Sequence, residues 1–327
     1  MSKVALITGI TGQDGSYLAE QLLEKGYEVH GLVRRASTFN TARLENLYRS
    51  TEDSQKIHLH YIDAVDSLHL FSLIERIAPD EIYNLMALSH VAQSFDQPEY
   101  TAETAGLGFL RILEIVRTIK LETRIYQAST SELFGATPPP QNEDSVFNPR
   151  SPYAAAKRYA HDMARIYRDG YGIFVSTGIL FNHESPRRSR TFVTRKISAG
   201  IAEILKGKRS SITLGNLDAK RDWGYAPEYT NAMWKILQLD NPTDLVIATG
   251  VQYSIRDFCQ FAFSHVNLEW QKYVNVSNQF ERPLEVESLC GDSSKARIAI
   301  GWNPNVLAPE LAKIMVEADL DLERFNY

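Results

Sequence analysis

Apolar runs of strand length alternate with amphipathic runs of helix length over the first 180 residues of the chain. We interpret six of these runs as buried strands: Lys3–Thr8, Tyr27–Val33, Ile57–Ile62, Glu81–Leu85, Arg124–Ser129 and Ile173–Leu180. Strands that alternate with helices form right-handed βαβ crossovers, which place helices on both faces of a parallel sheet. The pattern therefore predicts a doubly wound α/β fold of the Rossmann type.

The pattern changes beyond residue 180. A polar, turn-rich stretch at 180–192 precedes a helical pattern at 193–207, and shorter strand and helix signals follow. We predict a dinucleotide-binding domain over residues 1–180 and a smaller C-terminal α+β lobe over 181–327 that binds the substrate. Trp223–Gln238 has strong helical periodicity, so we expect about residues 223–250 to pack back on the sheet.

A glycine-rich turn connects the first predicted strand to the first predicted helix. The strand runs directly into the sequence Gly9-Ile10-Thr11-Gly12-Gln13-Asp14-Gly15, and a helical apolar stripe follows until Gly26. Glycines permit a tight turn and a close approach to a pyrophosphate, whose negative charge suits the positive end of the helix. The order of strand, turn and helix favours nucleotide binding over a plain turn.

The residues that follow the second and third predicted strands bear on which dinucleotide binds. Arg34 and Arg35 stand where an NAD enzyme usually has an acidic residue for the ribose 2′-hydroxyl, and arginine suits a 2′-phosphate. NADP is therefore favoured over NAD, the alternative being two arginines that only solvate a loop. Asp63 could accept a hydrogen bond from the adenine amino group, or it could simply form a turn.

Tyr153 and Lys157 lie four residues apart in a predicted helix, so their side chains should share one face. A neighbouring ammonium favours the phenolate and should lower the tyrosine pKa from about 10, which would make the tyrosine a base for an alcohol. In isolation the pattern is short and common, and would more often be a surface tyrosine beside a solvated lysine. Here it accompanies the glycine-rich turn.

Glu132 lies in the run Ser129–Gly135, before the Tyr153–Lys157 pair. A carboxylate near that pair offers a second, separate base, which suggests that oxidation of an alcohol is only the first step. The alternative is a carboxylate at a helix N-terminus, with Ser129 or Thr130 as the cap.

Three basic residues of the second half could clamp a diphosphate: Lys196, Arg221 and Arg282. Each lies in or beside a predicted loop, and each could instead be a solvated surface side chain.

Composition limits the classes of partner. The chain has 327 residues, 44% of them hydrophobic, and a net charge of −5, which argues against nucleic-acid and membrane-surface partners. Two cysteines are too few for a disulfide scaffold or a cysteine metal site, so we expect no metal and a reducing compartment. No apolar run approaches a membrane span, and the first residues are a strand and not a signal peptide, so we expect a cytoplasmic protein.

Several runs of sequence carry a family resemblance. The glycine-rich turn and the Tyr153–Lys157 spacing resemble the extended short-chain dehydrogenases/reductases in general. More specific runs lie at 178–188, 192–197, 217–224 and 282–287, and with QASTSELFG at 127–135 they resemble the GDP-mannose 4,6-dehydratase family over nearly the whole chain.

The resemblance implies an activity and a set of site residues. It implies NADP-dependent dehydration of GDP-mannose to GDP-4-keto-6-deoxymannose. The implied catalytic residues are Thr130, Glu132, Tyr153 and Lys157. Cofactor contacts would come from Gly9, Thr11, Gly12, Gln13, Asp14, Gly15, Arg34 or Arg35, Asp63, Ala64, Leu85, Ala87, Tyr153, Lys157, His183 and Arg188. The GDP-sugar would be held by Ser89, Glu132, Asn182, Lys196, Arg221, Arg282 and Glu285.

The resemblance also implies a homo-oligomer, either a dimer or a tetramer, in which residues 34–48 would reach the cofactor site of a neighbouring subunit. Five positions depart from the usual family pattern: Met86, Leu88, Ser189, Arg190 and Tyr225. They bear on the identity of the sugar and of the base.

Two other functions remain open. A nucleotide-sugar 4-epimerase or 4-keto-reductase would share the glycine turn and the Tyr153–Lys157 pair, but would not use Glu132 as an elimination base. A cofactor-sensing protein without activity would have no need of all four implied catalytic residues.

Overall fold

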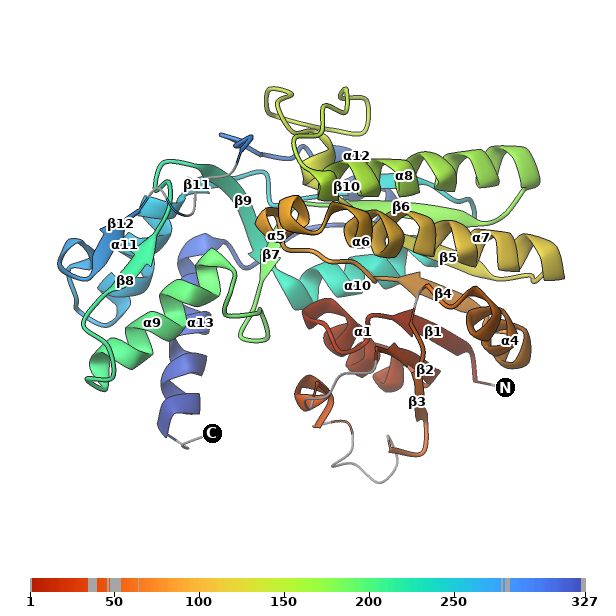
Figure 1. The fold of residues 1–327 in the computed structure, drawn as a ribbon, viewed down its shortest axis with the longest axis horizontal. Coiled ribbons are helices and arrows are strands. Elements are labelled where there is room, and N and C mark those ends of the chain that lie inside the picture. The colour runs from red at the N-terminus through yellow and green to blue at the C-terminus, as the bar shows by residue number, and fades with distance from the viewer. Residues whose placement is uncertain are drawn as a thin grey trace.

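A computed structural model describes residues 2–34, 40–45, 47, 54–63, 65–277, 279 and 283–324, with side chains described as far as residue 321. Its centre is a seven-stranded parallel sheet in the order β10-β6-β5-β4-β1-β2-β3 (Figure 1). The strands are β1 (Val4–Thr8), β2 (Glu28–Val33), β3 (Ile57–Tyr61), β4 (Glu81–Asn84), β5 (Arg124–Thr130), β6 (Val175–Leu180) and β10 (Asp244–Ile247).

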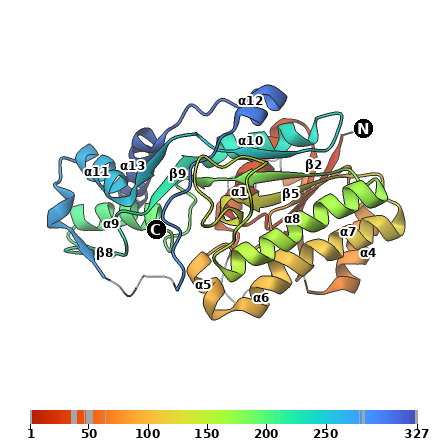
Figure 2. The same cartoon turned by 90° about the horizontal axis from the view of Figure 1, so that it is seen from above.

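Helices cover both faces of this sheet. One face packs against α4 (Ser67–Ile77), α7 (Gly108–Ile119) and α8 (Pro152–Tyr171), and the other against α1 (Gln13–Glu24) and α10 (Ala226–Leu237) (Figure 2). Short helices α5 (Val91–Asp96) and α6 (Pro98–Ala102) and a π-helical turn at Glu103–Leu107 lead into α7. The predicted doubly wound α/β fold is confirmed, and so are the six predicted strands, within a few residues at their ends.

The seventh strand comes from the second half of the chain. β10 pairs with β6, and the α10 helix that precedes it packs against α1. Trp223 to Tyr225, which the periodicity assigned to a helix, instead end strand β9 (Lys220–Tyr225), and the helix begins at Ala226. The sequence boundary at residue 180 stays a prediction.

The remaining elements form a smaller unit at one end of the sheet, on the left of Figure 1. Its helices α9 (Val193–Leu205), α11 (Ile255–His265) and α13 (Ala308–Arg324) pack around one hydrophobic core. Its strands are β7 (Asn182–Glu184), β8 (Ile212–Leu214), β9, β11 (Gln252–Ser254) and β12 (Val274–Val276). Helix α12 (Ser294–Ile300) lies instead beside β10 of the sheet and α10 (Figure 1). Among the helices described, none combines the length and apolar composition that crossing a bilayer requires.

Candidate active site

A cavity of about 800 Å³ opens at the carboxyl ends of the sheet strands and extends to β9 and α9 of the smaller unit. Strand order reverses between β1 and β4, so helices leave the sheet toward opposite faces at this point. Open parallel sheets bind ligands in the crevice at such a switch point. The cavity therefore lies where the sequence predicted a dinucleotide.

The glycine-rich turn forms the floor of the cavity. Gly9 has a φ of +72°, a conformation that L side chains rarely adopt. A Cβ on Gly15 would lie 2.4 Å from the Gly9 carbonyl oxygen, so only glycine lets the first turn of α1 pack against the loop. The N-terminus of α1 is thereby fixed at the cavity, and its positive end suits the pyrophosphate of a dinucleotide.

Buried polar side chains lock the strand ends to one another. The Thr8 hydroxyl donates to Asn84 Oδ1 at 2.7 Å, and Asn84 Nδ2 donates to Gln127 Oε1 at 2.6 Å. Gln127 Nε2 then donates to the Ala128 carbonyl at 3.0 Å. Lys157 Nζ donates to the same carbonyl at 2.8 Å, so the chain of bonds reaches from β1 to α8.

Tyr153 and Lys157 lie on one buried face of α8 and both line the cavity, as their spacing predicted. The expected effect of the lysine on the tyrosine is not found. Burial raises the pKa of Tyr153, a hydrogen bond with Thr130 lowers it in part and the negative charge of Glu132 raises it, so that the pKa is about 12. Burial also lowers the pKa of Lys157 to about 8. Loss of solvation outweighs the expected attraction, so Tyr153 is a neutral phenol at pH 7.

Thr130 connects the tyrosine to Glu132. It ends β5 and caps a short 3-10 turn (Ser131–Leu133), where its hydroxyl accepts from the Glu132 amide at 3.3 Å. The cap that the sequence offered as an alternative therefore exists. Glu132 is nevertheless buried and lines the cavity beside Tyr153, so the cap does not exclude a chemical role.

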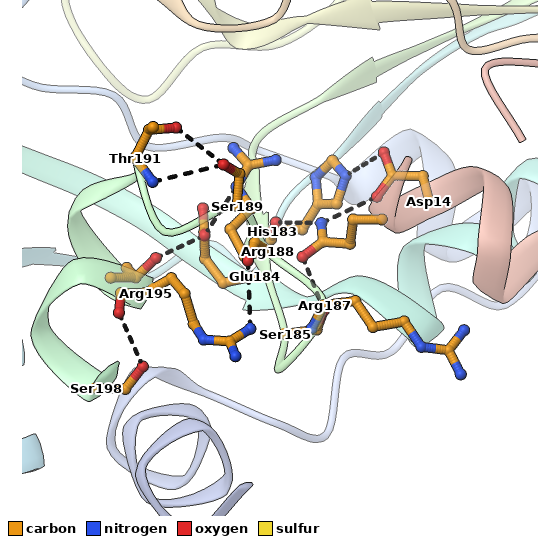
Figure 3. Close-up of polar contacts among 12 residues, drawn as sticks. Asp14, His183, Glu184, Ser185, Arg187, Arg188, Ser189, Thr191, Arg195 and Ser198 are labelled. Atoms are coloured by element: carbon orange, nitrogen blue, oxygen red, sulfur yellow. Dashed lines mark hydrogen bonds and ion pairs between the residues drawn. The ribbon is translucent and has the colours of Figure 1, made fainter. Parts of the chain in front are cut away.

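Asp14 and His183 form an ion pair across the cavity floor (Figure 3). His183 Nδ1 donates to the Phe181 carbonyl at 2.7 Å, while Nε2 lies 2.9 Å from Asp14 Oδ2. Burial alone would raise the pKa of Asp14, but the charge and hydrogen bond of His183 lower it to about 2. Burial lowers the pKa of His183, whereas Asp14 has the larger combined effect and raises it above 6.5.

The polar loop after β7 is held by its own side chains, as Figure 3 shows. Arg188 Nε lies 3.1 Å from Glu184 Oε2, and its guanidinium stacks 3.6 Å from the centre of the Phe192 ring. The Thr194 hydroxyl donates to the same Glu184 oxygen at 2.6 Å. Arg188 therefore faces the cavity in a fixed position.

Basic and polar groups of the smaller unit line the opposite end. Arg221, on β9, donates to Glu285 Oε1 at 3.3 Å, and Lys196 of α9 also lines the cavity. Asn182 Oδ1 is buried there and has no hydrogen-bond partner among the residues that the structure describes. A polar ligand that donates a hydrogen bond would satisfy this oxygen.

The predicted site residues gather in this one cavity. Those that line it are Gly9, Thr11, Gly12, Gln13, Asp14, Gly15, Arg34, Asp63, Leu85, Ala87, Ser89, Thr130, Glu132, Tyr153, Lys157, Asn182, His183, Arg188, Lys196, Arg221 and Glu285. Asp63 also forms the turn that the sequence offered as its alternative role, since its carboxylate accepts from the Val65 amide at 3.2 Å. Arg35, Ala64 and Arg282 lie outside the described residues. The individual roles assigned to all of these residues stay predictions.

Some residues that build the site were not predicted. Arg43 lines the cavity and donates to the Arg187 carbonyl at 2.7 Å and to the Thr11 carbonyl at 3.1 Å. Ser94 is buried and accepts from the Tyr153 amide at 3.2 Å. A signal existed for Thr8, Asn84 and Gln127, since polar residues in buried strands need partners. Arg43 lies in the segment 34–48 expected at a neighbouring subunit's cofactor site but lines the cavity of its own chain, and Ser94 lies in a segment without a motif.

The five departures from the family pattern divide into two groups. Met86 and Leu88 line the cavity, so they can act on ligand choice. Ser189, Arg190 and Tyr225 are not among its lining residues, and Arg190 instead pairs with Glu203 at 3.0 Å.

Comparisons with known proteins agree with this geometry. A family model described as GDP-mannose 4,6 dehydratase matches residues 6–315. A Caenorhabditis elegans protein named GDP-mannose 4,6 dehydratase 2 is 52% identical, with 98% of this chain and 90% of that protein covered. A Homo sapiens protein named GDP-mannose 4,6 dehydratase is 50% identical, with 99% and 93% covered.

Solved structures share the fold. The structure of dTDP-glucose 4,6-dehydratase from Bacillus anthracis, in complex with NAD, has a TM-score of 0.85 and 16% sequence identity. The match covers 99% of this chain and 98% of that one.

Proposed function

Because the chain belongs to the GDP-mannose 4,6-dehydratase family, we propose that it removes water from GDP-mannose to give GDP-4-keto-6-deoxymannose. The observation that carries the proposal is the convergence of Thr130, Glu132 and Tyr153 on one buried end of the cavity. Thr130 contacts both of the other residues. Tyr153 and Thr130, which would take the proton of the alcohol, therefore lie beside Glu132, a separate carboxylate for the elimination.

We propose NADP as the cofactor. The fixed glycine turn, the end of α1 and the Asp14–His183 pair fit a dinucleotide, and Arg34 at the end of β2 lines the cavity. An arginine in this position suits a 2′-phosphate, whereas NAD enzymes usually have an acidic residue there. When bound, the nicotinamide ring supplies a positive charge and the hydride acceptor for carbon 4, and later the hydride donor for carbon 6.

The residues of the chain perform the proton transfers. Tyr153 first loses its own proton to solvent, and as a phenolate it then accepts the proton of the sugar 4-hydroxyl, directly or through Thr130. Positive charge stabilises that phenolate, and Arg188 already lowers the pKa of Tyr153. Tyr153 and its environment therefore control formation of the 4-ketone.

Glu132 performs the elimination. A ketone at carbon 4 acidifies the hydrogen at carbon 5, so a carboxylate can remove it. The protonated Glu132 then donates to the carbon 6 hydroxyl, which leaves as water, and a proton returns to carbon 5 after carbon 6 is reduced. The sequence of steps leaves no net change of oxidation state in the sugar.

The experiment is incubation of purified protein with GDP-mannose and NADP⁺, followed by mass spectrometry. We expect a product lighter by one water molecule. Glu132→Gln should reduce the rate by about 10² to 10⁴, the usual worth of a positioned acid–base group. Formation of reduced cofactor in a single turnover should persist in that variant.

The matched control is Glu24→Gln, which changes an exposed carboxylate at the end of α1. No loss of water from any GDP-hexose would contradict the proposed function. Dehydration by Glu132→Gln at the wild-type rate would show that another group removes the carbon 5 proton.

We also propose a cytoplasmic homo-oligomer, a dimer or a tetramer. The support is apolar surface on α8, where Tyr159 and Ile166 are 36% and 51% exposed, next to Leu107 at 36%. Exposed apolar patches of this kind are typical of protein–protein contacts. Of the segment 34–48 that is expected to reach a neighbouring subunit, residues 35–39, 46 and 48 lie outside the described residues, and Arg34, Asn40 and Arg43 line the cavity of their own chain.

A further inference from the structure

A cluster of three histidines and one glutamate lies outside the active site, on strands β2 and β3. Glu28 and His30 are two residues apart on β2, and His58 and His60 are two residues apart on the edge strand β3. His30 is directly paired with His58 in the register of the two strands. Side chains at these spacings share one face of the sheet, so all four are neighbours.

The cluster faces the same side as α4 and α7. His30 is paired in register with Leu6 of β1, and Leu6 packs in the core formed with those helices. The His30 side chain is 13% exposed, while those of Glu28 and His58 are 40% and 42% exposed. The cluster is therefore built against the core on one side and open to water on the other.

Three potential ligand atoms converge. Glu28 Oε1 lies 3.2 Å from His30 Nε2 and 3.2 Å from His58 Nε2, and the three atoms lie within 4.8 Å of one another. Zinc ligands at about 2.0–2.1 Å in tetrahedral geometry lie about 3.3 Å from each other. The two distances from Glu28 Oε1 already match this value. The partly exposed His58 side chain can rotate to shorten the third distance, which joins it to His30.

His60 orients one of the ligands. Its Nε2 lies 2.9 Å from His30 Nδ1, and the two rings are nearly parallel, with an angle of 7°. When His30 donates its Nδ1 proton to His60, the lone pair on His30 Nε2 points toward Glu28. A metal-binding histidine is usually held in this way, through its second ring nitrogen.

The same distances also allow a cluster without a metal. His60 can donate to His30 Nδ1, while His30 and His58 both donate to Glu28 Oε1. The cluster with a metal and the cluster without one differ in where the histidine protons lie and in whether a metal cation is present. Arg76 of α4 places positive charge near His30 and His60, so we expect a weaker site than a closed structural zinc centre.

We propose that Glu28, His30 and His58 bind one divalent transition-metal ion, with Zn²⁺ as the best fit, and that His60 positions His30. Two imidazoles and one carboxylate are borderline ligands that suit zinc, and the open side admits water as a fourth ligand. The expectation of no metal rested on the two cysteines alone, and these histidines lie on separate strands without a motif spacing.

The ion would act on structure and not on the proposed reaction. It would add a metal-bridged link between the edge strand β3 and β2 to their ladder and to the side-chain contacts already present. Leu32 and Ile62, which line the cofactor end of the cavity, each lie two residues beyond His30 and His60. The bound ion would therefore hold the two strands together just below that end.

The experiment is a calorimetric titration of Zn²⁺ into tag-free, chelator-treated protein, repeated with Co²⁺ and recorded by visible absorption. We expect one equivalent to bind, a Co²⁺ spectrum typical of nitrogen and oxygen ligands, and a rise in the melting temperature. His58→Ala and Glu28→Gln should each weaken binding at least tenfold. Both side chains are partly exposed, so the variants should fold, and circular dichroism checks this.

Two control variants test the location. His265 forms a similar pair with Glu317 at 3.2 Å in the smaller unit, so His265→Ala should bind as the wild type does. Cys290→Ser should also leave binding unchanged. No saturable binding to the wild type, or equal binding to His58→Ala, would overturn the proposal and leave a hydrogen-bonded cluster only. Loss of the site in Cys290→Ser would place the ion elsewhere and would also overturn it.

Discussion

Single residues set the charge at the floor of the active site. The Asp14–His183 pair joins the first turn of α1 to β7, and each residue shifts the pKa of the other in the direction that keeps both charged. The pair therefore attaches the glycine-rich turn, where we expect a dinucleotide, to β7. Strand β7 in turn leads into the polar loop.

The pair makes stability depend on pH. A lowered Asp14 pKa contributes stability above the unfolded value of about 3.9, and this contribution is lost as pH falls toward 2. A raised His183 pKa contributes fully below about 6.5 and is lost as pH rises through the folded value. Asp14→Asn should therefore destabilise most between about pH 4 and 6.5.

Urea unfolding of the wild type and Asp14→Asn at pH 5.5 and at pH 9 measures this difference. Gln13→Asn is not a suitable control because Gln13 contacts the same loop, whereas Asp240→Asn changes an exposed carboxylate that does not line the cavity. An equal penalty at both pH values would show that the two charges do not interact.

All predicted site residues that the structure describes line the cavity, because most of them lie in short runs of sequence that carry the family resemblance. Sequence reasoning misjudged the environment of Tyr153, because a spacing of four residues gives proximity but says nothing of burial. It also missed Arg43 and Ser94, whose contacts depend on segments that are distant in sequence.

At the scale of elements, one buried ion pair joins α9 to the C-terminal helix α13. Arg195 Nε and Nη2 donate to the Asp319 carboxylate at 2.8 and 2.6 Å, and the Ser198 hydroxyl donates to it at 2.6 Å. Both charged side chains are almost fully buried. Lys196 lies beside Arg195 on the helix that faces the cavity, so this contact also positions a side chain that lines the cavity.

Asp319→Ala should lower the free energy of unfolding by about 3–5 kcal/mol, because it leaves the Arg195 charge buried without its partner. Chemical denaturation monitored by tryptophan fluorescence measures the change. The control is Glu317→Ala on the same helix, which removes an exposed partner of His265 and should cost at most about 1 kcal/mol. Equal effects of the two substitutions would contradict the predicted importance of burial.

Elements were predictable where apolar runs were long. Strands β1, β4, β5 and β6 are almost wholly buried, so their apolar runs are continuous and easily recognised, whereas the edge strand β3 is mostly half-buried. In the second half, strands such as β7 and β11 have three residues each, and tertiary pairing rather than local pattern defines them. The Trp223–Tyr225 error arose because a strand runs directly into a helix, so the apolar positions of both merge.

At the scale of the whole molecule, the cavity lies between the sheet and the smaller unit. A bound dinucleotide would contact the glycine turn of β1, while the rest of the cavity is lined by β9 and α9. Ligands that bind only the folded state raise its stability in proportion to the logarithm of their concentration over Kd.

NADP⁺ should therefore raise the melting temperature more than NAD⁺ at equal concentration, and Arg34→Leu should remove most of the difference. Differential scanning fluorimetry measures both shifts, and Arg117→Leu, which changes an arginine at the end of α7 remote from the cavity, is the control. An equal shift with the two nucleotides in the wild type would contradict the choice of NADP.

The seventh strand was not predicted because β10 follows a long excursion through the smaller unit.

The late position of β10 in the chain has a consequence during synthesis on the ribosome. Residues 175–180 of β6 are fully buried in the finished protein, yet β10, which pairs with them, emerges more than sixty residues later. Until then β6 presents an open, apolar edge, which is a template for pairing with other nascent chains. This polypeptide thus most needs a chaperone at the stage of synthesis before residue 247 has been translated.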